Sequence, residues 1–397
     1  MHHVIIINIL CVVAISASIY SIFDFFGPRW IWLKPDKTFN IDGLRAKELI
    51  VQEFDNAGNL WASRAMVIYR HKPGENGFER IGHVPTGFSY LWLSNFRLFR
   101  FITNRSECIE LTITGNGQIC VLSGGYIWHS QDNGLNFHRT LKLDHYGFGI
   151  GRGILCNGLL SVKDNMVYFG EYFRNKCRTH ARIYRSHDNG LTWEVAYVFE
   201  PGMIKHIHAL QEDPYTGKLW ICAGDSDNES MIGWSDDNFS SITVAGQGSQ
   251  SWRTCQLVFT EDFIYWGADT GSINSSGIYR MDKGNNALTK IADTHGSIMF
   301  GTRLSKGTIV FSSGREGFPN ERDNKTRLFA IDRHDNISVV ECGSWKYKKK
   351  GLIFRFATLR LQRTEGAKFL VASVLNQKEV PDGEMLIIPE DSLAPSV

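Results

Sequence analysis

The sequence predicts an all-β protein folded as a β-propeller of seven blades, and three observations support this prediction. Aromatic residues are abundant, with 25 Phe, 13 Tyr and 11 Trp, and aromatic side chains favour strands over helices. A short turn motif recurs at a spacing of about 50 residues, which is the length of a four-stranded blade. A second repeat, in which an apolar run ends in glycine and an acid, has a similar spacing.

The turn motif has two nearly complete copies and one degenerate copy. Ser130–Phe137 reads SQDNGLNF and Ser186–Trp193 reads SHDNGLTW, while Ser235–Phe239 lacks the glycine and continues to Ile242. These segments resemble the Asp-box, SxDxGxxW, of sialidases and related BNR-repeat propellers. In such a turn Asp accepts backbone N–H groups, Gly supplies a positive φ, and the aromatic residue packs into the blade. The resemblance implies that each motif joins the third and fourth strands of a blade, on the face opposite the active site.

The two repeats divide the chain into seven approximate units. These are 46–85, 108–144, 152–200, 205–247, 252–293, 297–342 and 352–390. Six blades are the alternative, because residues 86–107 and both ends of the chain are poorly patterned. We expect ring closure to borrow a strand from one terminus. The propeller domain is predicted over residues 40–393.

Residues 1–25 are predicted to be a targeting segment. The stretch from Val4 to Ile22 is apolar, and its small residues at 14 and 16–18 suit a cleaved signal peptide. An uncleaved membrane anchor is the first alternative, because the run approaches the roughly 20 residues that span a bilayer. A buried N-terminal strand or helix is the second. The segment predicts a secreted, periplasmic or membrane-anchored protein that faces away from the cytoplasm.

The overall charge does not favour a nucleic acid as partner. Lys and Arg number 43 and Asp and Glu number 41, for a formal net charge of +2, so any charge-based recognition is local. No metal or organic cofactor is expected. Two weaker alternatives are a zinc ligand pair of Cys177 and His180 and a calcium loop of Asp225, Asp227 and Glu229.

The glycine–acid repeat predicts the position of a ligand site. Its four acids, Glu171, Asp225, Asp269 and Glu316, follow the second strand of their blades. The second strand ends on the face where the innermost strand begins, around the central tunnel where propellers bind ligands. The beginnings of the innermost strands add Arg152, His206, His208 and Arg253. In Lys205–His208 a strand period of two aims both imidazoles to one side and Ile207 to the other.

Such a cluster suits the cleavage of an anionic glycan. For a polysaccharide lyase, Arg152 and Arg253 would hold the uronate carboxylate, and His206 or His208 would act with Tyr172 as base and acid. For a glycoside hydrolase, a pair of carboxyl groups would act as acid and base or nucleophile, and the candidates are Glu171, Asp225, Asp227 and Asp269. The residues predicted to bind substrate are Asp225, Asp269, Glu316 and Arg315.

Each of these residues also has a purely structural interpretation. Rim acids commonly cap turns or pair with a neighbouring Arg, and two histidines on one strand are often hydrogen-bonded structure. No Arg-Ile-Pro of the sialidase type precedes the first blade, and a three-arginine clamp would need Arg152, Arg253 and either Arg303 or Arg355.

The function predicted from the sequence is that of an extracytoplasmic carbohydrate-active enzyme. It would cleave a polysaccharide or oligosaccharide that contains uronic or sialic acid, by lyase or hydrolase chemistry. The alternative is a propeller that binds glycan or protein on the same face without catalysis. A scaffold held at a membrane by the N-terminal segment is the third interpretation.

Overall fold

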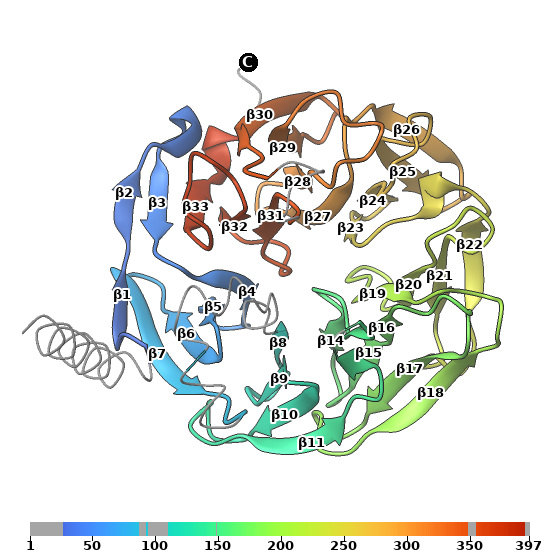
Figure 1. The fold of residues 1–397 in the computed structure, drawn as a ribbon, viewed down its shortest axis with the longest axis horizontal. Helices are drawn as coiled ribbons and strands as arrows, with labels where there is room; N and C mark the ends of the chain where they lie inside the picture. The colour runs from blue at the N-terminus through green and yellow to red at the C-terminus, as the bar shows by residue number, and fades with distance from the viewer. Residues whose placement is uncertain (1–26, 87–92, 94–109, 148, 348–354, 394–397) are drawn as a thin grey trace, which may run out of the picture.

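A computed structural model describes residues 27–86, 93, 110–147, 149–347 and 355–393, and these form a β-propeller (Figure 1). The described residues contain seven blades arranged around a central axis and one small additional sheet. In the part of the chain described, no helix is long and apolar enough to cross a membrane. The predicted leader, residues 1–25, lies outside the described residues. The all-β propeller prediction is confirmed.

Blades 1 to 6 are antiparallel, and in each the innermost strand precedes the strands outside it along the chain, except for one earlier strand at the outer edge of blade 1. Blade 1 contains β4 (Ile50–Phe54), β5 (Leu60–Arg64), β6 (Val67–His71), β7 (Gly77–His83) and, outside them, β1 (Trp30–Trp32). Blade 2 contains β8 (Glu110–Ile113), β9 (Ile119–Ser123), β10 (Tyr126–Ser130) and β11 (His138–Lys142). Blade 3 contains β14 (Leu159–Ser161), β15 (Val167–Gly170), β17 (Ala181–Ser186) and β18 (Glu194–Phe199).

Blades 4 to 6 follow the same order. Blade 4 contains β19 (Ile207–Glu212), β20 (Leu219–Ala223), β21 (Met231–Ser235) and β22 (Thr243–Gln247). Blade 5 contains β23 (Leu257–Phe259), β24 (Phe263–Gly267), β25 (Ile278–Asp282) and β26 (Leu288–Ala292), and blade 6 contains β27 (Ile298–Arg303), β28 (Ile309–Ser313), β29 (Lys325–Ile331) and β30 (Ile337–Ser344). The additional sheet contains β12 (Tyr146–Gly147), β13 (Gly151–Gly153) and β16 (Tyr172–Phe173), and the 3₁₀ helices are η1 (Thr38–Asn40), η2 (Gln250–Trp252) and η3 (Glu390–Ser392).

Blade 7 closes the ring with strands from both ends of the chain. The C-terminal β31 (Thr358–Leu361), β32 (Phe369–Leu375) and β33 (Met385–Pro389) pair with the N-terminal β3 (Gly43–Ala46) and β2 (Lys34–Asp36). Leu44 pairs with Ile387, and Figure 1 shows the blue β3 beside the red β33. The expected borrowing of a terminal strand is confirmed, and the described residues form seven blades rather than six.

Two glycines of the glycine–acid repeat, Gly170 and Gly267, allow neighbouring blades to pack. A Cβ on Gly170 at the end of β15 would lie 2.3 Å from Cγ2 of Ile207, which begins the innermost strand of the next blade. A Cβ on Gly267 would lie 2.2 Å from Cβ of Ile298 in the same arrangement two blades later. Real Cβ atoms do not approach this closely, so these two glycines are required by contact between blades.

The three turn motifs join the third and fourth strands of blades 2, 3 and 4. In the first, the Ser130 hydroxyl accepts the Gly134 N–H at 2.9 Å, and Asp132 Oδ1 accepts the Asn136 N–H at 2.9 Å. The bonds from Asn136 and Ser130 lower the pKa of Asp132 to about 2. The second motif has the same bonds around Ser186 and Asp188.

The third motif keeps its turn without the glycine. Phe239 has a φ of 60°, and its N–H donates to the Ser235 hydroxyl at 2.9 Å. Its ring is fully buried against Tyr168, with ring centroids 5.5 Å apart. Burial of the aromatic ring offsets the strain of a positive φ at a residue other than glycine.

Blade 6 contains a related turn that the sequence pattern did not identify. Asp332 Oδ1 accepts the Asn336 N–H at 2.9 Å between β29 and β30, as Asp132 does with Asn136. Ala330 occupies the position of the motif's serine, so only the aspartate bonds remain. The turn therefore depends less on the complete motif than the sequence indicated.

Replacing Ser235 by Ala should lower the free energy of unfolding by about 1–3 kcal/mol, because the buried Phe239 N–H loses its acceptor. The matched control is Asp236→Ala, one residue away on the exposed side of the same turn, which should stay within about 0.5 kcal/mol of wild type. Urea unfolding measures both variants. Equal effects would show that the serine does not hold the turn.

Gly267→Ala should lower the free energy of unfolding by about 1–3 kcal/mol through overpacking against Ile298. Gly314→Ala is the control from the same repeat, because its added Cβ would lie 3.5 Å from the Ala357 carbonyl oxygen, an ordinary contact distance. Thermal or urea unfolding should separate the two variants. Similar stabilities would contradict the explanation of the repeat by blade packing.

Candidate functional site

Five predicted residues meet where the innermost strands of blades 4 and 5 begin. Tyr172 lies on β16, His206 and His208 lie at the start of β19, Asp225 follows β20, and Arg253 lies between η2 and β23. We call these five residues the rim cluster. They come from four separate segments of the chain and meet only because consecutive blades place equivalent strand ends together.

The two histidines share one carboxylate oxygen. His206 Nε2 lies 3.2 Å from Asp225 Oδ1, and His208 Nε2 lies 3.1 Å from the same atom. The two Nε2 atoms are 3.1 Å apart. A bulge in the pairing of β19 with β20 lies between Ile207 and Ala209, and Ile207 points into the hydrophobic core. The expected alternation of imidazoles and isoleucine is observed.

Backbone carbonyls determine which nitrogen of each ring carries a proton. His206 Nδ1 lies 2.9 Å from the Phe173 carbonyl oxygen, and His208 Nδ1 lies 3.0 Å from that of Thr254. A carbonyl oxygen only accepts, so each Nδ1 is the donor. In the neutral rings, both Nε2 atoms therefore present lone pairs toward Asp225.

Positive groups surround the Asp225 carboxylate. Lys205 Nζ contacts Oδ2, and Arg253 Nη2 lies 3.4 Å from Oδ1. Burial by itself would raise the pKa of Asp225, but its contacts with the imidazoles of His206 and His208 and the charge of Arg253 outweigh burial and hold this pKa far below its usual range. Burial also lowers the pKa of His206, against the opposing effect of Asp225. The surroundings thus favour an ionised Asp225 carboxylate and the neutral form of His206.

Tyr172 covers the histidine pair. Its ring centroid is 4.1 Å from that of His206 and 6.1 Å from that of His208. Burial raises the pKa of Tyr172, with smaller contributions from Cys255 and the rim carboxylates, while Arg152 acts in the opposite direction. Arg152 is exposed on β13, which pairs with β16. The structure therefore brings Arg152 next to the rim cluster as well.

A second acidic group lies on the far side of Arg253. Arg253 Nη2 is 3.3 Å from Asp269 Oδ2, and the Cys255 thiol lies 3.5 Å from the same oxygen. Burial, followed by the charge of Asp269, raises the pKa of Glu316 to about 8. Arg253 thus neutralises buried carboxylates, in a position where the sequence analysis expected it to hold a substrate.

Glu171 and Arg315 do not join the rim cluster. Glu171 accepts hydrogen bonds from His145 Nδ1 at 3.0 Å and from the Arg182 N–H at 2.9 Å, which direct its carboxylate into blade 3. Arg315 is completely buried, and its guanidinium donates to the Gly314 carbonyl at 2.7 Å and contacts Asp323 at 3.3 Å. Both side chains serve the packing of their own blades.

The sequence alternatives for other sites also find structural partners. Glu229 accepts two bonds from Arg178 at 2.9 and 3.1 Å and caps the backbone of Ser226. Its carboxylate therefore does not converge with Asp225 and the exposed Asp227 in a calcium loop. Among the described residues, Cys177 and His180 belong to no group with metal-ligand spacing.

The three-arginine clamp does not form through Arg303. Arg303 ends β27 and pairs with Glu365 at 3.3 Å, whereas Arg253 lies before β23. Because the innermost strands run in the same direction, the two arginines lie at opposite ends of the propeller.

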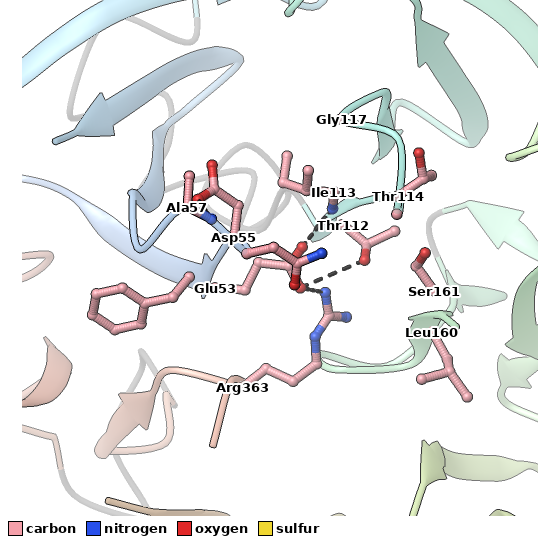
Figure 2. Close-up of a pocket in the computed structure, with 13 residues that line it drawn as sticks. Glu53, Asp55, Ala57, Thr112, Ile113, Thr114, Gly117, Leu160, Ser161 and Arg363 are labelled. Atoms are coloured by element: carbon pink, nitrogen blue, oxygen red, sulfur yellow. Dashed lines mark hydrogen bonds and ion pairs between the residues drawn. The ribbon is translucent and has the colours of Figure 1, made fainter. Parts of the chain in front are cut away.

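A cavity lies at the end of the propeller opposite the rim cluster, and Figure 2 shows residues that line it. It measures about 330 Å³ and is lined by the hairpins that follow the innermost strands of blades 1 and 2, with Ser161 and Arg363. Glu53 accepts hydrogen bonds from Ile113 N–H and from the Arg363 guanidinium in its wall. Glu53 and Arg363 of this wall are paired with each other, and Asp55 accepts hydrogen bonds from the backbone N–H groups of Ala57 and Asn59.

Buried charges in the centre separate this cavity from the rim cluster. Arg360 donates to Gln52 and to Glu110 at 3.0 Å each. The Asn157 N–H donates to Glu110 at 2.7 Å, and the Asn157 side chain donates to Gln256 at 3.0 Å. We call these five residues the central plug. The sequence patterns did not predict this plug, although Arg360 lies between Leu359 and Leu361 in β31, a signal that could have identified it.

Similarity to known proteins extends to the fold alone. No protein family model matches the sequence, and no curated protein is significantly similar to it. The GH74 enzyme of Niastella koreensis superposes with a TM-score of 0.50 at 13% identity, over 87% of this chain and 58% of that one. YCF48 bound to a D1 peptide has a TM-score of 0.51 at 11% identity, over 93% and 98% of the two chains. YCF48 from Cyanidioschyzon merolae has a TM-score of 0.51 at 12% identity, over 87% and 96%. All three comparisons support the β-propeller fold.

Proposed function

We propose that the protein acts outside the cytoplasm on an acidic polysaccharide or oligosaccharide and cleaves it over the rim cluster by lyase or hydrolase chemistry. The observation that carries the proposal is the convergence of a phenol, two imidazoles and a guanidinium on one propeller rim. Ligand sites of propellers lie at such rims. The resemblance of the turn motifs to the Asp-box of sialidases agrees with a glycan as ligand.

Arg152 is the residue best placed to recognise the acid group of the glycan. It is exposed, and it lines a hollow of about 40 Å³ with Tyr146 and Gly151. A space of this size holds a few water molecules or a carboxylate group, but not a sugar ring. A guanidinium binds a carboxylate through two parallel hydrogen bonds. In this proposal Arg152 anchors the carboxylate, and Arg253 orients Asp225 and Asp269.

Tyr172 is the residue proposed to exchange a proton with the glycan. It is partly exposed, whereas His206 and His208 are only 3% and 2% exposed. The histidines therefore act on the site through Tyr172 and Asp225. A positioned phenol that donates or accepts a proton contributes about 10²–10⁴ in rate.

The second candidate function is binding without catalysis. The burial of both histidines and the pairing of Asp225 and Asp269 with basic groups favour it. The similar folds include both an enzyme and a protein bound to a peptide, and one fold serves many functions. The products distinguish the candidates: a lyase releases unsaturated uronates that absorb ultraviolet light, a hydrolase releases reducing ends alone, and a binder releases neither.

Tyr172→Phe should lower kcat on the cleaved glycan by about 100-fold or more, because the phenolic proton is lost while the ring is retained. The assay uses the full-length chain with polygalacturonate, hyaluronan and sialyllactose as probes. Tyr197→Phe is the matched control, since Tyr197 lies on the outer strand β18. Full activity of Tyr172→Phe would remove the phenol from the mechanism, and no product from any acidic glycan would favour the binding function.

Arg152→Ala should raise KM for the acidic glycan by about 10- to 100-fold with little change in kcat, because charge-assisted hydrogen bonds are worth about 1.5–3 kcal/mol. Steady-state kinetics of the wild type and the variant measure the change. The same glycan with its carboxyl groups reduced to alcohols is the control, and the two proteins should treat it alike. An unchanged KM on the acidic glycan would contradict the role of Arg152.

A further inference from the structure

Three potential ligand atoms form a nearly equilateral triangle within the rim cluster. The edges are 3.1 Å between the two histidine Nε2 atoms, 3.2 Å from His206 Nε2 to Asp225 Oδ1, and 3.1 Å from His208 Nε2 to the same oxygen. From the sequence, Asp225 was a candidate only for a calcium loop with Asp227 and Glu229, and the two histidines were not expected to bind a metal.

Hydrogen bonding alone does not satisfy this triangle. Both Nδ1 atoms donate to backbone carbonyls, so each neutral ring presents an unprotonated Nε2, and the carboxylate oxygen also only accepts. One proton added to a histidine Nε2 would form a hydrogen bond along only one edge of the triangle. A second would place two imidazolium nitrogens 3.1 Å apart, in a buried site that already contains Lys205 and Arg253.

A divalent ion would satisfy all three atoms together. Zinc binds histidine nitrogen and carboxylate oxygen at about 2.0–2.2 Å in tetrahedral geometry, which separates its ligand atoms by roughly 3.3 Å. The observed edges are close to this separation. Two imidazoles and one carboxylate also suit other first-row ions such as Co²⁺.

Backbone carbonyl groups already orient the two histidines in the way that histidine ligands are oriented in metal sites. In metal sites the nitrogen that does not bind the ion usually donates to a carbonyl or carboxylate, which orients the ring. The carbonyls of Phe173 and Thr254 do this for His206 and His208. Lys205 contacts Oδ2 of Asp225, so Oδ1 faces the two histidines, with Arg253 Nη2 3.4 Å away.

We propose that His206 Nε2, His208 Nε2 and Asp225 Oδ1 are three ligands of a divalent transition-metal site with zinc-like geometry. Three protein ligands leave a fourth position for water or an anionic oxygen, as in catalytic zinc sites. The positive charges of the ion, Lys205 and Arg253 exceed the negative charges of Asp225 and Asp269, so an anion would complete the site. The proposal does not depend on the proposed function, because ion binding is measured without a glycan.

The test is a titration of the full-length, chelator-treated protein with Co²⁺ and then Zn²⁺. We expect one Co²⁺ per chain with the strong visible absorption of tetrahedral cobalt, its displacement by Zn²⁺, and a rise in Tm with added Zn²⁺. Asp225→Asn and the double variant His206→Gln/His208→Gln should weaken binding at least 100-fold and lose the rise in Tm.

Two matched controls separate this site from incidental binding. Cys177→Ser/His180→Ala removes an exposed pair of potential ligands, and His187→Ala removes an exposed histidine; both should bind one ion as the wild type does. If the site variants do not fold, the cobalt spectrum of Cys177→Ser/His180→Ala decides, because one tetrahedral ion must remain. A folded wild type without stoichiometric binding, or equal binding by the site variants, would overturn the proposal. If the wild type binds one ion but cleaves no acidic glycan, only the proposed function is contradicted.

Discussion

Pairing of β3 with β33 joins residues from the two ends of the chain, and the arrangement of the whole ring depends on it. A propeller blade packs both of its faces against neighbours, so an open ring would expose two apolar faces. The N-terminal β3 completes blade 7 beside β33 and β32, and this closes the contact between blades 7 and 1. Closure positions the seven innermost strands around one axis, and the geometry of both ends of the propeller follows from their common direction.

The centre of the ring separates two ends with different chemistry. The central plug connects blades 1, 2, 5 and 7 through Gln52, Glu110, Gln256 and Arg360, with Asn157 between them. Breaking a buried ion pair costs several kcal/mol because the remaining charge is left without a partner. The plug therefore stabilises one arrangement of the blades. The cavity beyond it has paired charges, whereas the rim cluster gathers groups suited to acid–base chemistry or to an ion.

The rim cluster depends on features of blades 3 to 5 that differ from the regular repeat. The additional sheet carries Tyr172 and Arg152 toward the start of blade 4, and the alternation of side chains at the start of β19 directs both imidazoles to the same side. Glu171 precedes Tyr172 directly, but its bonds with His145 and Arg182 hold it in blade 3. Glu171 and Tyr172 thus take different roles, although they are adjacent in sequence, because their side chains contact different residues.

Local signals in the sequence determined the fold and the region of the site. The turn motifs and the glycine–acid repeat act over a few residues, through side-chain bonds to nearby N–H groups and through steric contact of glycine with the next blade. Since these signals mark equivalent strand ends, they placed Tyr172, His206, His208, Asp225 and Arg253 on one rim. Only the tertiary structure decided which carboxylate each cation engages, and it removed Glu171 and Arg315 from the cluster and revealed the central plug. The physical reason is that the partners of a buried charge lie one or more blades away, at distances along the chain that no local pattern records.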